Sequence, residues 1–174
     1  MTAISRPVAA FLFDLDDTLY PEQAWRFSGY RAIARYIAPE RENELAAFCA
    51  AQEVLGRRVG VLDALVDYCG MSRYFIPSLL GLYHFHRPKI VPYLDVFEVL
   101  LVLQHHGHKL GIVTNGNYII QRTKLSALGI GIMFDSIIHA DLIEPKPSYK
   151  PFLVAATSLG VETSECFYVG NDPM

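Results

Sequence analysis

A chain of 174 residues is long enough for one full domain, or for a compact core with a small insertion. Its composition, 52% hydrophobic and 19% charged, is typical of a packed globular protein and excludes intrinsic disorder. The net charge of −3 offers no basic face to nucleic acid, and no apolar run approaches the roughly 20 residues of a membrane span. Three scattered cysteines without a CxxC pair indicate reduced thiols, so we expect a cytoplasmic protein.

The first predicted element is a buried strand, because Val8 to Phe13 are apolar without helical spacing. Three acids, Asp14, Asp16 and Asp17, follow at once. A buried strand does not tolerate such a cluster, so the acids must lie where the strand emerges, at the end where open α/β sheets bind ligands. Two carboxylates there repel each other unless a cation lies between them. The cluster therefore predicts a hard-cation site, most simply Mg²⁺, beside a carboxylate able to act as a nucleophile.

An acidic turn that caps a helix is the alternative interpretation of this cluster, with Asp17 or Thr18 as the N-cap. For an isolated Asp-x-Asp-x-Thr pattern the two interpretations are about equally good. The remainder of the chain decides between them.

Residues 20–90 are predicted to be helical throughout. Glu22 to Ile37 carries aromatic and aliphatic residues at spacings of three to five, and Pro39 ends this helix. Further helices are predicted over 40–55, 61–69 and 72–86. No stretch in this region alternates as a strand does. We therefore expect 20–90 to be a helical domain inserted into a core made of residues 1–19 and 91–174.

From residue 92 onward, predicted strands and helices alternate. The strands cover 109–113, 134–138 and 166–169, and the helices cover 93–106, 118–128 and 148–159. Such alternation implies right-handed crossovers and a parallel sheet, so the predicted fold class is α/β with a Rossmann-like core. Parallel strands place four strand ends at one edge of the sheet. These ends carry Asp14 and Asp16, Thr114 and Asn115, the loop with Lys146, and Asn171 and Asp172.

This set of side chains is what phosphoryl transfer requires. A carboxylate attacks phosphorus, while a cation and a fixed ammonium neutralise the charge on the phosphoryl oxygens. A second acid protonates the leaving oxygen and then activates water. Hydroxyl and backbone N–H donors around Thr114 and Gly116 can hold the remaining oxygens.

Four short motifs in this order resemble those of the haloacid dehalogenase superfamily of phosphohydrolases. Residues 14–19 match its DxDxT first motif, and 113–116 are similar to the second, a hydrophobic strand that ends in Thr or Ser. Lys146-Pro147 is similar to the third motif, and 168–172 to the start of the acidic fourth. The resemblance runs from about Val8 to the last residue, with 20–90 matching the family's inserted helical cap.

The resemblance implies Mg²⁺-dependent hydrolysis of a small phosphorylated metabolite through an aspartyl-phosphate. Asp14 is similar to the nucleophile and Asp16 to the general acid/base. Thr114, Asn115 and Lys146 would bind the phosphoryl group, and the Lys146 ammonium would also restrain the nucleophile.

The metal site implied by the resemblance comprises Asp14, Asp16 through its backbone carbonyl, and Asp172. Asn171 is the rival of Asp172, because the family's spacing from glycine to acid varies. The family's fourth motif usually continues with a second acid, a helix and a strand, whereas this sequence stops at Met174. We therefore expect a fragment or a reduced site, with weak metal-dependent activity and an exposed sheet edge that favours self-association.

Several alternatives remain open at this level. One alternative is that the chain is an inactive fragment or a binding module. Another is that the same core residues catalyse a phosphomutase reaction. A 2-haloacid dehalogenase does not need the acid Asp16, whose presence argues against that activity. His105, His106 and His108 resemble a metal cluster, although a solvated helix end explains them better. Lys150 competes with Lys146 as the catalytic ammonium, and its expected place inside the next helix favours Lys146.

Neighbouring side chains also have two interpretations each. Asp141 and Glu144 precede the third motif, and either can orient its lysine. Tyr20, Trp25 and Arg26 follow the first motif, where they line the substrate entrance or, as aromatic stripes usually do, form core.

Overall fold

A computed structural model describes residues 8–56 and 60–171. Contacts divide the chain into two compact units. The sheet unit comprises the residues up to Glu22 and those from Ile90 on, and the helical unit is Gln23–Lys89. Tyr20 belongs to the sheet unit, where it is fully buried.

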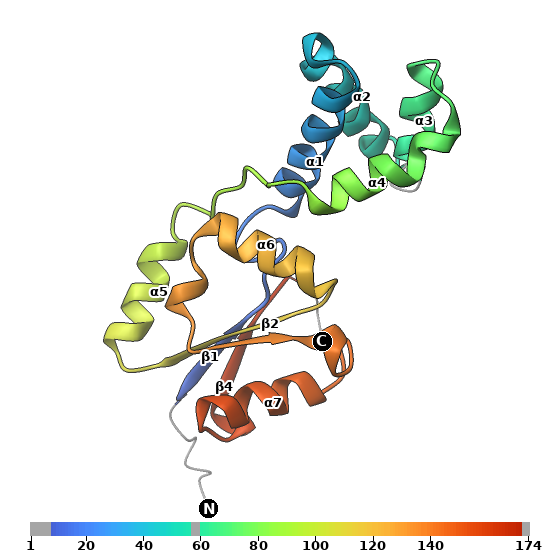
Figure 1. Cartoon of the computed structure of the whole chain (residues 1–174). Helices are drawn as coiled ribbons and strands as arrows, with labels where there is room; N and C mark the ends of the chain where they lie inside the picture. Colours follow the sequence, from blue (N-terminus) through green and yellow to red (C-terminus); the bar gives the residue numbers. More distant parts are fainter. Residues whose placement is uncertain (1–7, 57–59, 172–174) are drawn as a thin grey trace, which may run out of the picture. The chain divides into compact units, whose positions relative to one another are not determined.

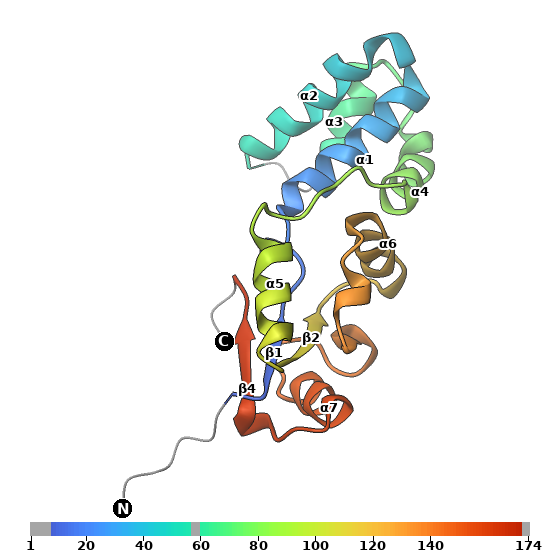
Figure 2. The same ribbon diagram turned by 90° about the vertical axis from the view of Figure 1, so that its left-hand side faces the viewer.

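The sheet unit contains a parallel four-stranded sheet in the order β3-β2-β1-β4. The central strand β1 (Ala10–Phe13) pairs with β2 (Lys109–Thr114) on one side and β4 (Cys166–Val169) on the other, while β3 (Ser136–His139) pairs with β2. The arrows of β2 and β4 point the same way in Figure 2. The predicted α/β class and parallel sheet are confirmed.

Three helices cover this sheet. Figure 1 shows α5 (Val96–His105) and α6 (Tyr118–Leu128) on one face and α7 (Lys150–Leu159) on the other. Right-handed crossovers produce this arrangement, because the chain steps outward from β1 to β3 and then returns across the sheet to β4. The absence of a side chain at Gly111 of β2 leaves room for the Leu12 side chain of β1. A Cβ at Gly111 would lie only 2.7 Å from Leu12 Cδ2.

The helical unit is built from α1 (Glu22–Ile37), α2 (Glu42–Val54), α3 (Val61–Tyr68) and α4 (Ile76–Phe85). Apolar side chains from all four helices meet in its core. Figure 2 shows the four helices gathered side by side. The largest fully buried members of that core are Ile33, Leu45, Leu65 and Leu79. Burial of apolar stripes, rather than helix propensity, therefore holds these short helices together.

Predicted element boundaries differ from the observed ones where prolines and caps intervene. Pro39 begins a short 3₁₀ turn, Pro39–Arg41, so α2 starts later than predicted. Ser72 accepts a hydrogen bond from the backbone of Tyr74 and caps a second 3₁₀ turn, which delays α4 to Ile76. Within the described residues, no helix combines the length and the apolar character needed to cross a membrane.

Candidate active site

The carboxyl ends of the strands align in register. Phe13, the last residue of β1, lies opposite Ile112 of β2 and Val169 of β4, and Thr114 of β2 lies opposite His139 of β3. The loops that leave these strands therefore start from one edge of the sheet. This edge belongs entirely to the sheet unit, and it gathers most of the side chains that the sequence singles out.

Asp14 and Lys146 form a direct ion pair at this edge. The Lys146 Nζ lies 2.7 Å from Asp14 Oδ1, and the two side chains are only 12% and 10% exposed. The same oxygen accepts a hydrogen bond of 2.8 Å from the backbone N–H of Leu15. The Asp14 N–H continues the ladder by donating to the carbonyl of Val169. Both side-chain contacts described for Asp14 are made at Oδ1.

The Lys146 segment is fixed to the end of β2 by Asn115. The Asn115 side chain accepts a hydrogen bond from the Lys146 N–H at 2.8 Å and donates to the Lys146 carbonyl at 3.2 Å. The Lys146 ammonium also donates to the Tyr168 hydroxyl of β4 at 3.0 Å. Asn115 thus orients the lysine through its backbone, and its role in phosphate binding stays a prediction.

Asp16 is surrounded by hydrogen-bond donors. Lys124 of α6 lies 2.7 Å from Asp16 Oδ1 and 2.9 Å from Oδ2. The Tyr20 hydroxyl donates to Oδ1 at 2.5 Å, and the Gln121 side-chain amide donates to Oδ2 at 2.9 Å. Burial, then the Asp16 charge, raises the pKa of Tyr20, so its hydroxyl remains a donor. Tyr20 is a core residue rather than part of a substrate entrance.

Gln121 connects this acid to the second motif. Its amide nitrogen lies 2.7 Å from Thr114 Oγ1 and 2.9 Å from the Asn115 carbonyl. Both Gln121 and Thr114 are buried, at 2% and 1% exposure. An amide that touches the hydroxyl of the second motif and the acid of the first fixes their relative placement.

Sequence reasoning missed Gln121 and Lys124. Gln121 and Lys124 are three residues apart on α6. They are buried on the same face of this helix as Leu125 and Leu128. Polar residues at positions that helical spacing assigns to the core are the signal that could have found them, because such groups are rarely buried without a partner.

The structure describes some, but not all, of the oxygen ligands that the sequence predicts for Mg²⁺. Asp14 Oδ2 and the Asp16 backbone carbonyl are hard oxygen donors, the type that Mg²⁺ prefers. Asn171 follows β4 and is exposed. Asp172, the expected third ligand, lies outside the described residues. The donor chemistry of the first motif fits the ion, and the choice between Asn171 and Asp172 stays a prediction.

The rival lysine has a different partner. Lys150 pairs with Glu144, and both side chains are about half exposed. This contact lowers the pKa of Glu144 and raises that of Lys150. Glu144 therefore does not orient Lys146, and the exposed Asp141 does not pair with it either.

Two further features of the sequence have a place in the structure. The histidines at 105, 106 and 108 lie at the end of α5 and the turn before β2, and no metal-ligand cluster of three or more His, Cys, Asp or Glu occurs among residues 8–56 and 60–171. Asp17 adopts a positive φ of 54° and accepts a hydrogen bond from the Glu22 N–H. It is a turn residue at the start of α1.

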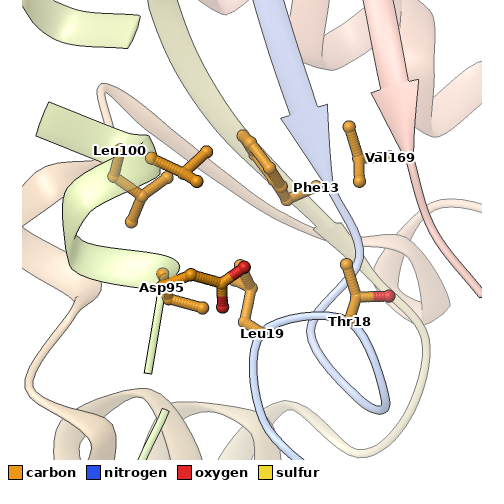
Figure 3. Close-up of a pocket in the computed structure, with 8 residues that line it drawn as sticks. Phe13, Thr18, Leu19, Asp95, Leu100 and Val169 are labelled. Atoms are coloured by element: carbon orange, nitrogen blue, oxygen red, sulfur yellow. The ribbon is translucent and has the colours of Figure 1, made fainter. Parts of the chain in front are cut away.

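A separate pocket of about 150 Å³ lies on the α5 side of β1 and β4 (Figure 3). Figure 3 shows Phe13, Leu100 and Val169 lining it, with Thr18 and Asp95 as the polar members among its labelled residues. Thr18 Oγ1 is buried there without a hydrogen-bond partner among the described residues. The mainly apolar lining lacks the paired charges that phosphoryl transfer needs, which are found at the Asp14–Lys146 edge.

Comparison with known proteins identifies a family model and several curated proteins of similar sequence. The model of the haloacid dehalogenase-like hydrolase family matches residues 11–174. The glyceraldehyde 3-phosphate phosphatase of Methanopyrus kandleri is 34% identical, over 94% of this chain and 76% of its own length. The pyrophosphatase PpaX of Bacillus velezensis is 28% identical, over 95% of this chain and 75% of its own. The phosphoglycolate phosphatase of Xanthomonas campestris pv. campestris is 32% identical, over 94% and 74%.

Solved structures share the fold at lower identity. The L-2-haloacid dehalogenase of Xanthobacter autotrophicus superposes with a TM-score of 0.57 at 19% identity, covering 92% of this chain and 69% of its own. A haloacid dehalogenase superfamily hydrolase of Ehrlichia chaffeensis gives 0.59 at 20% identity, covering 96% and 80%. The family match over nearly the whole chain, together with the parallel α/β sheet, shows that this chain belongs to the haloacid dehalogenase-like hydrolase family.

Proposed function

We propose that this chain hydrolyses a small phosphomonoester with the help of Mg²⁺, through an aspartyl-phosphate on Asp14. Relatives 28–34% identical over most of the chain are named as phosphatases and a pyrophosphatase, so the chain is a phosphatase of the haloacid dehalogenase type. The observation that carries the mechanism is the Asp14–Lys146 ion pair of 2.7 Å at the sheet edge that also carries Asp16.

In the first step, a carboxylate oxygen of Asp14 attacks phosphorus and the bond from phosphorus to the leaving oxygen breaks. Asp16 gives its proton to that oxygen, which departs as the alcohol. In the second step, Asp16 takes a proton from water, and the water oxygen attacks phosphorus. The acyl-phosphate bond breaks, which restores the Asp14 carboxylate and releases inorganic phosphate.

Charge neutralisation falls to groups that the fold holds in place. The Lys146 ammonium, held by Asp14 and Tyr168, can contact a phosphoryl oxygen without leaving its site. The Thr114 hydroxyl accepts a hydrogen bond from Gln121, which leaves its own proton for a phosphoryl oxygen in place of the 3.3 Å contact to the Asn115 carbonyl. These donors are positioned before substrate arrives, which is how electrostatic catalysis avoids reorganisation.

The Mg²⁺ would be held by Asp14, by the Asp16 backbone carbonyl and by Asp172 or Asn171. When bound, it supplies positive charge that offsets the repulsion between the Asp14 carboxylate and an anionic substrate. The substrate class we propose is a small phosphorylated metabolite, by analogy with the relatives named as phosphatases of glyceraldehyde 3-phosphate and phosphoglycolate.

The test is hydrolysis of p-nitrophenyl phosphate and a panel of small phosphomonoesters by the full chain, with Mg²⁺ and with EDTA. We expect Mg²⁺-dependent turnover that Asp14→Asn abolishes, because an amide does not attack phosphorus. Glu98→Gln is the matched control, since Glu98 is an exposed acid on α5 that forms no described ion pair or hydrogen bond with Asp14, Asp16 or Lys146. Turnover by Asp14→Asn at the wild-type rate would exclude the aspartyl-phosphate mechanism, and turnover in EDTA would exclude the metal.

A further inference from the structure

We propose that Lys124 is a positioning residue for Asp16, which holds that carboxyl group in the orientation needed to protonate the leaving oxygen. This inference rests on the proposed function and adds a second lysine to the site, with a task different from that of Lys146. The two lysines each pair with a different carboxylate at the same sheet edge, Lys146 with Asp14 and Lys124 with Asp16.

The exposed fractions of the Lys124 and Asp16 side chains differ, and the difference indicates which of the two can contact substrate. The Lys124 side chain is 5% exposed, whereas that of Asp16 is 26% exposed. Lysine is almost never buried this far unless it is paired, and its described ion pair is with Asp16. The buried ammonium group of Lys124 is poorly placed to bind substrate directly. The half-buried acid in front of it can still reach a substrate, so Lys124 acts through Asp16.

The geometry restricts rotation of the carboxyl group. Lys124 contacts both oxygens of Asp16, at 2.7 and 2.9 Å, while Tyr20 donates to one oxygen and Gln121 to the other. Donors therefore contact both oxygens of the carboxylate, which limits its rotation about χ2. When one oxygen carries the proton, the other still accepts from the ammonium. Lys124 can thus keep the group oriented before and after proton transfer.

Orientation matters more for some substrates than for others. A general acid must lie within hydrogen-bond reach of the leaving oxygen, and a misplacement of about 1 Å can cost 10²-fold in rate. An alkyl phosphate releases a strongly basic alkoxide that needs this proton. An aryl phosphate such as p-nitrophenyl phosphate releases a stable phenolate and needs it far less. Loss of a positioning residue therefore changes the ratio of the two rates, whereas a general loss of folded enzyme lowers both equally.

The experiment compares wild type, Lys124→Met, Asp16→Asn and the double variant on p-nitrophenyl phosphate and on an alkyl phosphate. We expect Lys124→Met to lower kcat for the alkyl phosphate by about 10²-fold and that for the aryl phosphate by less than about tenfold, with KM nearly unchanged. In the Asp16→Asn background the same change should cost little more, because residues that act as a unit are not additive. Lys109→Met, an exposed lysine at the far end of β2, is the matched control.

A structural readout does not depend on turnover. In a crystal structure of Lys124→Met we expect the Asp16 carboxylate to have moved relative to Gln121, with the rest of the sheet unit unchanged. Equal losses on both substrates, full additivity with Asp16→Asn, or an unmoved carboxylate would each overturn the proposal. Failure of the proposed function gives a different result, because the wild-type chain would then hydrolyse neither substrate in the presence of Mg²⁺. In that case the crystal structures would still show whether Lys124 holds the Asp16 carboxylate in place.

Discussion

The Lys146 ammonium lies 2.7 Å from Asp14 Oδ1, whereas Lys150, four residues further along, pairs with Glu144. The Lys146 side chain is 12% exposed and that of Lys150 is 54% exposed. A charge in the drier environment interacts more strongly with its partner, because less water screens it. The two lysines of this loop are therefore expected to differ sharply in their effect on catalysis.

We predict that Lys146→Met lowers kcat by about 10²–10³-fold, the cost typical of losing one donor that stabilises charge in the transition state. Lys150→Met should stay within about twofold of wild type, because exposed ion pairs contribute little. The measurement is the Mg²⁺-dependent rate with p-nitrophenyl phosphate, with circular dichroism to check that both variants fold. A larger loss in Lys150→Met would mean that the third motif is wrongly placed on Lys146.

The sequence predicts the fold well because its signals are local. Apolar runs of strand length, each followed by polar residues, predict all four strands of the sheet unit within about three residues at either end. Parallel pairing then follows from the alternation with helices, and it places Asp14, Thr114 and Lys146 at one edge without any knowledge of contacts. Element starts such as that of α4 are less predictable, since a 3₁₀ turn and a helix use the same capping residues.

The environment of Asp16 is not predictable in the same way. Asp16 and Lys124 are separated by more than a hundred positions, and their contact depends on how α6 packs over the ends of β1 and β2. The helical spacing of Gln121, Lys124 and Leu125 places them on one face, but does not say which strand end that face meets. Packing of a helix on a sheet sets that neighbour, and a single sequence does not record it.

Gln121 provides the next prediction. Its amide is within hydrogen-bond distance of Asp16 Oδ2, Thr114 Oγ1 and the Asn115 carbonyl. Gln121→Leu conserves much of the volume but removes these bonds. We expect kcat/KM to fall by roughly 10–100-fold, because a hydrogen bond to a charged group is worth about 1.5–3 kcal/mol. Gln104→Leu is the control, since Gln104 is an exposed glutamine on α5 whose amide bonds the Met133 carbonyl. Equal rates for the two variants would contradict this role.

Gly29 lies close against the Tyr83 ring in the helical unit. A Cβ at this position would lie 2.6 Å from Tyr83 Cδ2 and 3.3 Å from His86 Cε1. Gly29→Ala should therefore lower the free energy of unfolding by about 1–3 kcal/mol, the usual cost of overpacking. Gly81 lies inside α4, and a methyl group added there would meet no described atom within 4 Å, so Gly81→Ala should raise that free energy by up to about 1 kcal/mol.

The measurement is urea unfolding followed by the fluorescence of Trp25, the single tryptophan of the chain, which lies in the helical unit beside Tyr83. The paired variants separate a steric effect from the general preference of helices for alanine. If Gly29→Ala is as stable as Gly81→Ala, the contact with the Tyr83 ring is not close enough to matter.

The last prediction concerns pH and His86, which is 5% exposed beside the Trp25 and Tyr83 rings. Its Nδ1 contacts the Tyr83 carbonyl at 2.6 Å, and its Nε2 is buried with no partner among the described residues. Burial lowers the pKa of His86, an effect that the hydrogen bond to the Tyr83 backbone partly offsets. The unfolded chain, with an ordinary histidine pKa of about 6.5, then binds a proton before the folded chain does. Stability is thus complete above that value and is lost as the pH falls towards the folded pKa.

We expect the free energy of unfolding of wild type to decrease between about pH 7.5 and 5.5, by at most about 1.4 kcal/mol for each unit of pKa shift. His86→Phe keeps an aromatic ring against Trp25 and removes the titration, so its stability should vary less over the same range. His139, whose pKa burial also lowers, is present in both chains and cancels in the comparison. Urea unfolding monitored through Trp25 at the two pH values measures the difference. Identical pH dependence in the two chains would place the titrating group elsewhere.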